Sequence, residues 1–339
     1  MQIKLLTGED PRWEAFVMRH PEATFFHRLG WKRVLEEAFG HPAYYFYAEQ
    51  NGEVVGILPL GQIKSVLFGN ALISTPFCVY GGALAVNGEI RVALEQKALE
   101  LARELKVDWL EFRYLAPSGA ARPTKDLYVT FKKSLLPELE ANFKAIPRKQ
   151  RAMVRKGMAA GLVSTLDDGI DRFYAVYAVS LRNLGTPIFP KRYFEVLKQA
   201  FGEACEILVV EQHGQPVAAV MSFYFKDEVL PYYGGGTPAA RELAAFDFMY
   251  WEVMRRAIAK GVKVFDYGRS KRGTGSFRFK THWGFQPQPL YYECELIRAR
   301  RLPEVNPLNP KYRLFIQAWR RLPLPVANLI GPWLARSLG

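Results

Sequence analysis

The chain has 339 residues, of which 49% are hydrophobic and 14% aromatic, and it carries a formal net charge of +13. This composition can fill a hydrophobic core in each of two domains, and it excludes a chain that is mostly disordered. The three cysteines, Cys78, Cys205 and Cys294, are far apart and form no C-x-x-C pair. A disulfide framework and a zinc motif are therefore not indicated, and a reducing, cytoplasmic compartment fits best.

The first half of the chain predicts a fixed order of elements. A helix covers residues 31–40, and an apolar hairpin over residues 44–60 is interrupted at Asn51-Gly52. A strand that ends in glycines at Val79–Gly82 follows, then a helix and a short strand at Val107–Tyr114. Mixed α/β units have this kind of alternation.

The second half repeats that order. It has a helix at residues 194–202, a hairpin interrupted at His213-Gly214, a strand that ends in glycines at Pro231–Gly236, a helix, and a strand at Val262–Gly268. The repetition predicts two α/β domains with mixed sheets, related by internal duplication. We place the boundaries by the sequence pattern, as follows: an N-terminal domain at 1–136, a basic helical linker at 137–165, a C-terminal domain at 166–295 and a basic, Pro-rich tail at 296–339.

The linker is cationic. Pro137 opens one helix, and Pro147 opens a second that runs to a cap at Gly161. Between Lys144 and Lys156 there are six Lys and Arg residues and no acid. The candidate anion-binding residues are Arg148, Lys149, Arg151, Arg155 and Lys156. Clustered rather than interspersed charge suggests an anionic partner.

The tail is the second cationic segment, with eight Lys and Arg residues against Glu304 alone. Its proline residues exclude one long helix. A short amphipathic piece at residues 311–322 would pack on the body through Leu314, Phe315, Ala318 and Trp319, or lie on an anionic membrane. No apolar run is long enough to span a bilayer, and the N-terminus lacks the apolar region of a secretion signal.

Several catalytic chemistries lack their residues. The sequence has no G-x-S-x-G, H-E-x-x-H, P-loop or G-x-G-x-x-G motif, and its five histidines are scattered. No metal site is expected. A catalyst built from this chain would work by binding, positioning and electrostatics.

The densest group of candidate residues lies at 265–285. A strand ends near Gly268, a loop with glycines follows, and a short helix begins near Ser276. The backbone N–H groups of such a loop, surrounded by Arg269, Lys271 and Arg278, would bind a phosphate or carboxylate; the alternative is a charged loop that only aids solubility. Asp266 either points into a cleft as a base or anchor, or pairs with Arg269.

Three of these segments carry a resemblance to a known family. They are the cationic helix at 146–156, Asp266-Tyr-Gly-Arg-Ser270 and Phe279-Lys-x-x-Trp-Gly284. With the duplication, they resemble FemAB-type acyltransferases, which are built from tandem GNAT folds. Together with Asn306-Pro-Leu-Asn-Pro-Lys-Tyr312 and the tail, they are similar to the FemAB-like proteins associated with exosortase and PEP-CTERM exopolysaccharide systems.

The resemblance implies transfer of an activated acyl or aminoacyl group to an amine, in exopolysaccharide or cell-envelope biosynthesis. The implied donor is aminoacyl-tRNA or an acyl-CoA or other acyl thioester, with no tightly bound cofactor. Lys280 matches a lysine that is implicated in catalysis in the tRNA-using members of that family. The charge of Lys280 would stabilise an oxyanion, and Trp283 and Phe279 would lie beside the ammonium. The stretch after Tyr233 is not the [QR]-x-x-G-x-[GA] loop of acetyl-CoA enzymes, and the helical coiled-coil insertion of some tRNA-using relatives is absent.

Open α/β sheets bind ligands at strand ends, so we expect the acceptor near Gly268 and near Tyr233, Gly234 and Gly235. The anionic partner would be tRNA, CoA, or a lipid or nucleotide diphosphate, and the expected location is cytoplasmic, with peripheral contact at the inner face of the membrane. Three alternatives to this function remain open: an acetyl-CoA-dependent N-acetyltransferase, a nucleic-acid-binding module, and a non-catalytic protein of a polysaccharide assembly.

Overall fold

The computed structural model describes residues 1–65, 68–302 and 310–337, and it confirms the predicted mixed α/β class. The described chain forms two compact units. The first contains residues 1–127, 289–302 and 335–337, and the second contains residues 128–288 and 310–334. No helix among the described residues is long and apolar enough to cross a membrane.

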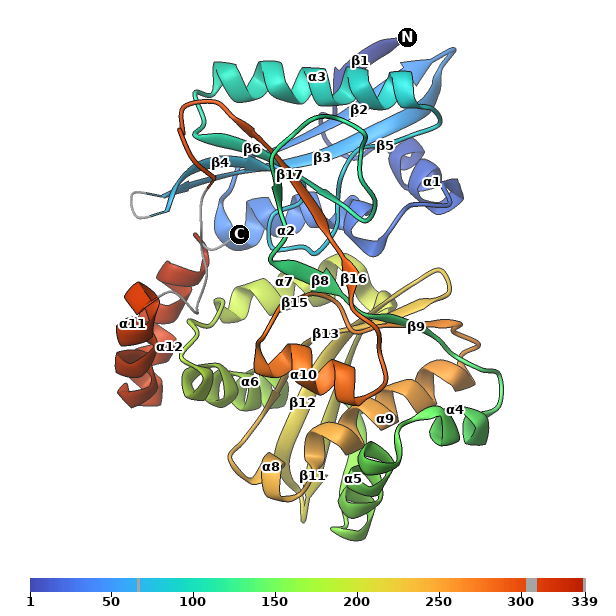
Figure 1. Cartoon of the computed structure of the whole chain (residues 1–339), viewed down its shortest axis with the longest axis vertical. Coiled ribbons are helices and arrows are strands. Elements are labelled where there is room, and N and C mark those ends of the chain that lie inside the picture. The colour runs from blue at the N-terminus through green and yellow to red at the C-terminus, as the bar shows by residue number, and fades with distance from the viewer. Residues whose placement is uncertain (66–67, 303–309, 338–339) are drawn as a thin grey trace. The chain divides into compact units, whose positions relative to one another are not determined.

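The first unit is built on one sheet of strand order β1-β2-β3-β4-β6-β17-β7, with β5 beside β3. Its strands are β1 (Gln2–Leu5), β2 (Ala43–Gln50), β3 (Glu53–Ser65), β4 (Gly69–Ile73), β5 (Leu84–Ala85), β6 (Trp109–Tyr114), β7 (Thr124–Lys125) and β17 (Tyr291–Leu296). Helix α3 (Gly88–Glu104) covers one face, and α1 (Pro11–Arg19) and α2 (Gly30–Phe39) cover the other (Figure 1). Because both faces are covered, most of β3 is buried along its length.

The second unit has a sheet of order β10-β11-β12-β13-β14-β9. Its strands are β9 (Lys132–Ser134), β10 (Val163–Asp167), β11 (Cys205–Gln212), β12 (Gln215–Phe225), β13 (Glu228–Gly236) and β14 (Val264–Asp266). A small sheet has the order β15-β8-β16, with β8 (Tyr128–Thr130), β15 (Ser270–Lys271) and β16 (Gln288–Pro289).

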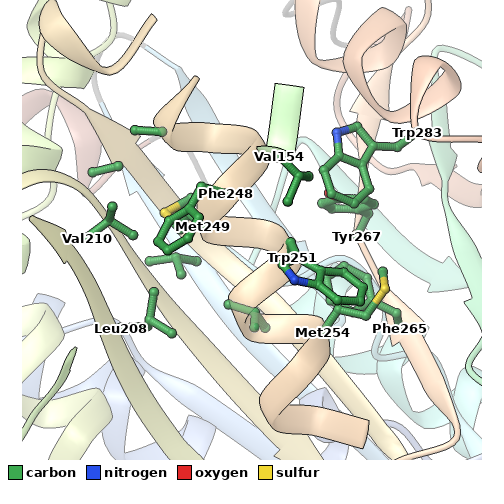
Figure 2. Close-up of a cluster of buried hydrophobic side chains, with 14 of the residues drawn as sticks. Val154, Leu208, Val210, Phe248, Met249, Trp251, Met254, Phe265, Tyr267 and Trp283 are labelled. Carbon is green, nitrogen blue, oxygen red and sulfur yellow. The ribbon is translucent and has the colours of Figure 1, made fainter. Parts of the chain in front are cut away.

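The helices of the second unit are α4 (Leu139–Ala145), α5 (Arg148–Ala159), α6 (Asp171–Leu184), α7 (Lys191–Phe201), α8 (Ala239–Glu242), α9 (Ala245–Ala259), α10 (Gly275–His282), α11 (Pro310–Arg321) and α12 (Leu324–Ala335). Helices α6 and α9 pack on the sheet, and α11 packs on α6. The core between the sheet and α9 holds Trp251, Phe265, Tyr267 and Trp283, with Val154 of α5 (Figure 2).

The two sheets share features that support the duplication. In each, four strands are antiparallel, the fifth is parallel to the fourth, and the sixth is antiparallel to the fifth. The hairpins turn at Asn51-Gly52 and His213-Gly214, and all four of these residues have positive φ. Such turns match the twist of the strands they join. Each hairpin also has a register shift next to its turn, at Ala48/Glu49 and at Val210/Glu211.

Strand pairing, rather than order along the chain, decides which segment belongs to which unit. Strand β17 follows the second repeat in sequence, yet it pairs with β6 of the first unit over six residue pairs. Strand β9 follows the first repeat, yet it pairs with β14 of the second unit. The sequence-based division had assigned residues 291–295 to the C-terminal domain and residues 132–134 to the N-terminal domain.

One predicted strand was wrong. Val79–Gly82 is an irregular segment of a buried loop, and the strand before it is β4, which ends at Ile73. The chain leaves the sheet because Thr75 and Phe77 have positive φ, a conformation that interrupts a strand. The N–H groups of Gly81 and Gly82 donate instead to the carbonyl oxygen of Arg113.

Candidate active site

Lys280 lies on α10, facing the loop that follows β14. Thr274 caps the start of the helix, because its hydroxyl oxygen accepts a hydrogen bond from the N–H of Phe277. The Nζ of Lys280 donates to the carbonyl oxygens of Gly268 and Arg269, at 3.0 Å each. It also lies 5.6 Å from the ring centroid of Phe131 and 5.9 Å from that of Tyr267. The side chain therefore ties α10 to the end of β14.

The environment of Lys280 shifts its titration. Burial removes water from the ammonium and lowers the pKa of Lys280 to about 7, with Arg269 adding to the decrease and Asp266 opposing it. Both protonation states are therefore populated near neutral pH. An ammonium has three donors, of which the two carbonyl oxygens use two, so the charged form retains one N–H for another acceptor.

Asp266 ends β14 and is fully buried. Its Oδ1 accepts from the N–H of Gly268 at 2.7 Å and from the hydroxyl of Thr130 at 3.4 Å, and its Oδ2 lies 3.5 Å from the Nζ of Lys132. Burial raises the pKa of Glu228, which also pairs with Lys132. These contacts make Asp266 an anchor of the turn that presents the carbonyl oxygen of Gly268 to Lys280.

Trp283 follows α10 and is buried against α9. Its indole N–H donates to Oδ1 of Asp247 at 2.9 Å, and its ring lies edge-on to Tyr267, with centroids 6.2 Å apart (Figure 2). We expected Trp283 to form the aromatic wall beside Lys280; in the structure, the rings close to the ammonium are those of Phe131 and Tyr267. Phe279 packs between Tyr250 and Trp283, with distances of 5.7 and 6.2 Å between its ring centroid and theirs.

Two polar groups near Trp283 were not recognised in the sequence. Burial raises the pKa of Asp247 to about 6, although the hydrogen bond from Trp283 opposes the increase. The hydroxyl of Tyr267 is buried and has no hydrogen-bond partner within the described residues. The available signal was that Asp247 is the single acid in the apolar stretch from Leu243 to Trp251.

Tyr233, Gly234 and Gly235 lie on β13, where their surroundings are those of packing residues. The hydroxyl of Tyr233 bonds that of Tyr193 at 2.6 Å inside an aromatic cluster. A Cβ on Gly235 would lie 3.0 Å from the Cα of Tyr177 on α6, and a Cβ on Gly234 would lie 2.9 Å from the hydroxyl oxygen of Tyr250 on α9. Successive residues thus let helices approach opposite faces of the sheet.

The cations of the loop gather around one ring. The guanidinium of Arg269 and the ammonium of Lys271 lie over Tyr128, at 4.7 and 5.5 Å from its centroid, and burial lowers the pKa of Lys271. Arg278 is exposed and donates to the carbonyl oxygen of Gly273 at 3.2 Å. Arg269 and Lys271 lie between β14 and α10, and Arg278 lies on α10 together with Lys280.

The predicted basic helix is α5. Gln150, Val154 and Gly157 form its buried side, which faces α9, and Arg148, Lys149, Arg155 and Lys156 are exposed. Two of its cations make contacts within the unit: Arg151 donates to the carbonyl oxygen of Lys144, and Arg155 lies over the ring of Phe143. The exposed side of α5 is strongly cationic, while its inner side shares a core with Trp283.

Two hollows are present in the second unit. A cavity of about 150 Å³ is bordered by Trp283, Phe285, Lys133 and Asn142 among others. An open groove of about 430 Å³ lies along α6, lined by Val176, Val179 and Thr237 among others, and none of the predicted site residues lines it. Within the described residues, no three His, Cys, Asp or Glu side chains are grouped to hold a metal ion.

Residues 142–281 match the acetyltransferase (GNAT) domain family. This GNAT segment includes α5, β14 and Lys280. No curated protein sequence matches the chain. The Asn306–Asn309 part of the segment that suggested the exosortase-associated subgroup lies outside the described residues, as do the side chains of residues 310–312.

Several solved structures share the fold over most of the chain. FemX has a TM-score of 0.65 and 14% identity, over 94% of this chain and 100% of its own. L-PGS from Bacillus licheniformis has a TM-score of 0.57 and 12% identity, over 93% and 98%. A tandem GNAT protein from the clavulanic acid biosynthesis pathway has a TM-score of 0.56 and 14% identity, over 87% and 98%. The TM-scores show a common tandem GNAT-like fold, and at identities this low the likeness extends to the fold alone.

Proposed function

We propose that this protein transfers an activated acyl or aminoacyl group to an amine, with Lys280 at the reacting carbonyl. The observation that carries the proposal is the GNAT match over residues 142–281, a segment that includes Lys280 on α10 near its end. The lowered pKa of Lys280 and its remaining N–H support this role, because the group is partly desolvated and held at a strand end.

In the proposed reaction, the uncharged amine attacks the carbonyl carbon of the donor, and a C–N bond forms. The carbonyl oxygen becomes an oxyanion, which accepts a hydrogen bond from the Lys280 ammonium. The oxyanion then reforms the carbonyl as the bond to the leaving oxygen or sulfur breaks. The proton lost by the amine ends on that leaving group, so charge and atoms balance. Asp266 acts as a positioning residue, because it fixes the turn whose carbonyl oxygens hold Lys280.

As the donor we favour aminoacyl-tRNA over an acyl thioester. The exposed cations of α5 provide a surface for a phosphate backbone, and the stretch after Tyr233 departs from the acetyl-CoA loop. In FemAB-type relatives the product belongs to the cell envelope, so we extend the proposal to an amine acceptor of envelope or exopolysaccharide biosynthesis. The exosortase-associated assignment rests on the sequence resemblance.

The direct test uses the purified chain with tRNA charged with labelled amino acids, or with labelled acyl-CoA, and an amine acceptor. We expect release of deacylated tRNA that depends on the acceptor. Release of CoA from acyl-CoA would instead identify an acyl thioester as the donor, and the reaction would still be acyl transfer. If neither donor is consumed with any acceptor from envelope precursors, the enzymatic proposal fails and an anion-binding protein is the better description.

The substitution Lys280→Met tests the site. Loss of one preorganised oxyanion donor lowers turnover on the order of 10²–10³-fold. Because the carbonyl oxygens of Gly268 and Arg269 also lose their donor, we expect a small decrease in thermal stability, and rates should be measured well below the transition. Lys133→Met is the matched control, because Lys133 also donates to a backbone carbonyl oxygen, that of Ala145, and lies over an aromatic ring, but is not a candidate site residue. If both variants retain turnover within a few-fold of the original chain, Lys280 has no part in the mechanism.

A further inference from the structure

Within the part of the chain that the structure describes, the tail helix α12 packs against the second unit by one side. Its 12 residues include no charged side chain. Ala327 and Gly331 are buried, and a Cβ on Gly331 would lie 3.1 Å from the backbone nitrogen of Ile188. This close approach determines which side of the helix faces the protein.

The opposite side of α12 is apolar and exposed. Val326, Leu329, Ile330 and Trp333 recur at three- and four-residue intervals, so they form one stripe. Leu329 is 79% exposed and Trp333 is 64% exposed. A contiguous apolar surface of this kind marks a binding surface in a folded protein.

Helix α11 adds apolar groups and positive charge. Trp319 is buried, as expected for packing on the body, whereas Leu314 is 74% exposed and Phe315 is also exposed. Arg313, Arg320 and Arg321 are exposed along it. The sequence from Pro310 to Ser337 contains no Asp or Glu. The surface that covers these two helices must therefore accept apolar side chains and carry negative charge.

We propose that the outer face of α12, centred on Leu329 and Trp333, binds the headgroup region of an anionic lipid bilayer. Such a surface offers acyl chains for the stripe and phosphates for the arginines, and tryptophan favours the boundary between them. The 12 residues rise about 18 Å, less than the roughly 30 Å of a hydrocarbon core, so α12 lies in the interface. The proposal does not depend on acyl transfer.

The test is co-sedimentation of the full chain with vesicles of phosphatidylcholine alone or mixed with phosphatidylglycerol, without any acyl donor. We expect binding to the mixed vesicles that weakens with salt. The double substitution Leu329→Gln with Trp333→Gln should lower partitioning at least about tenfold. Val92→Gln with Met18→Gln removes two exposed apolar side chains elsewhere and should leave binding unchanged.

A second measurement locates the contact. The three native cysteines are buried, so Leu329→Cys can be labelled with an environment-sensitive fluorophore, whose emission should shift to the blue with mixed vesicles. Three results would overturn the proposal. One is unchanged binding by the Leu329 and Trp333 double variant, and another is no binding to mixed vesicles. The third is a dimer in sedimentation that this variant dissolves, which would identify a second copy as the occupant.

Discussion

Lys280 combines a structural contact with an unusual titration. Its Nζ donates hydrogen bonds to two backbone carbonyl oxygens. Because its pKa is lowered to about 7, a small change in pH near neutrality alters its charge. Sequence reasoning could place this residue on a short helix after a strand end, because Gly268 and Gly284 bracket the segment. It could not give the pKa, which arises from desolvation by residues far apart in the sequence, such as Phe131 and Tyr267.

The pH dependence of turnover tests which form of Lys280 acts. The ammonium donates to the oxyanion, so its contribution falls as pH rises through about 7, while deprotonation of the acceptor amine raises the rate. We therefore expect a bell-shaped profile of kcat/KM. Lys280→Met should retain the rising limb and lose the falling one. If kcat/KM of the unmodified chain keeps rising well above pH 7 and shows no maximum, neutral Lys280 acts as a base.

Asp247 gives a stability test. Its folded pKa of about 6 exceeds the ordinary 3.8, so between these values the folded chain binds more protons than the unfolded chain, and stability falls as pH rises. Asp247→Asn keeps an oxygen that accepts from Trp283 and cannot ionise. We expect the variant to be more stable by about 1–2 kcal/mol at neutral pH, with the gain lost near pH 4.

Urea unfolding at several pH values measures this difference. Glu100→Gln, on the exposed side of α3, is the control and should show no comparable change. A variant that is less stable than the original chain at neutral pH would mean that ionised Asp247 has a stabilising partner, contrary to the burial described above. Asp247 itself was missed from the sequence because an acid within an apolar helical stretch does not reveal whether it faces the core.

At the level of elements, sequence patterns predicted the local structure well where turns or caps are explicit. The hairpins at Asn51-Gly52 and His213-Gly214 form as predicted, and α5 begins after Pro147 with Gly161 just beyond its end. Patterns failed at Val79–Gly82, where an apolar run that ends in glycines is a buried loop. Burial on all sides produces the same composition in a loop as in a central strand.

Helix α5 provides the test at this scale. We expect tRNA to bind with an affinity that falls steeply with salt, because cations on α5 release counterions from phosphates. Arg148→Glu with Lys156→Glu should abolish this binding while preserving the fold, since both side chains are exposed. These positions are preferable to Arg151 and Arg155, which contact Lys144 and Phe143.

Filter binding or fluorescence anisotropy over a salt series would measure the effect. Arg103→Glu with Lys106→Glu makes the same change in charge at two exposed positions, in the last turn of α3 and just after its end, and serves as the control. If the two double variants weaken binding equally, net charge explains the affinity and α5 is an ordinary solvated face.

For the whole molecule, the duplication predicted the architecture, but the exchange of edge strands was hidden. The repeats are contiguous in sequence, and nothing in the pattern of Tyr291–Leu296 says which sheet it joins. The structure shows why it joins the first: Glu293 accepts from the N–H and hydroxyl of Ser118 and pairs with Arg122, and Tyr292 donates to the carbonyl oxygen of Val79. These are long-range contacts, which local patterns do not encode.

A fragment of residues 1–127 should therefore not fold on its own. Without β17 it exposes the edge of β6 and leaves Arg122 and Ser118 without Glu293. We expect no cooperative thermal transition for 1–127, and restoration of one when residues 289–302 are fused to its end through a flexible linker. Residues 128–288 retain every strand of their main sheet and should unfold cooperatively. A cooperative transition in 1–127 alone would contradict this account.

The exchanged strand also sets an order for biosynthesis. Strand β6 is translated early. Its partner β17 ends at Leu296, about 170 residues after Leu127, where the first segment of this unit ends. At about 5–20 residues per second, the first sheet waits roughly 10–30 s for its missing neighbour. During this time the second unit can complete its own sheet, so the half that is translated first is the last to close. Nascent chains of this protein therefore expose an unpaired β6 edge, where chaperones would be expected to bind.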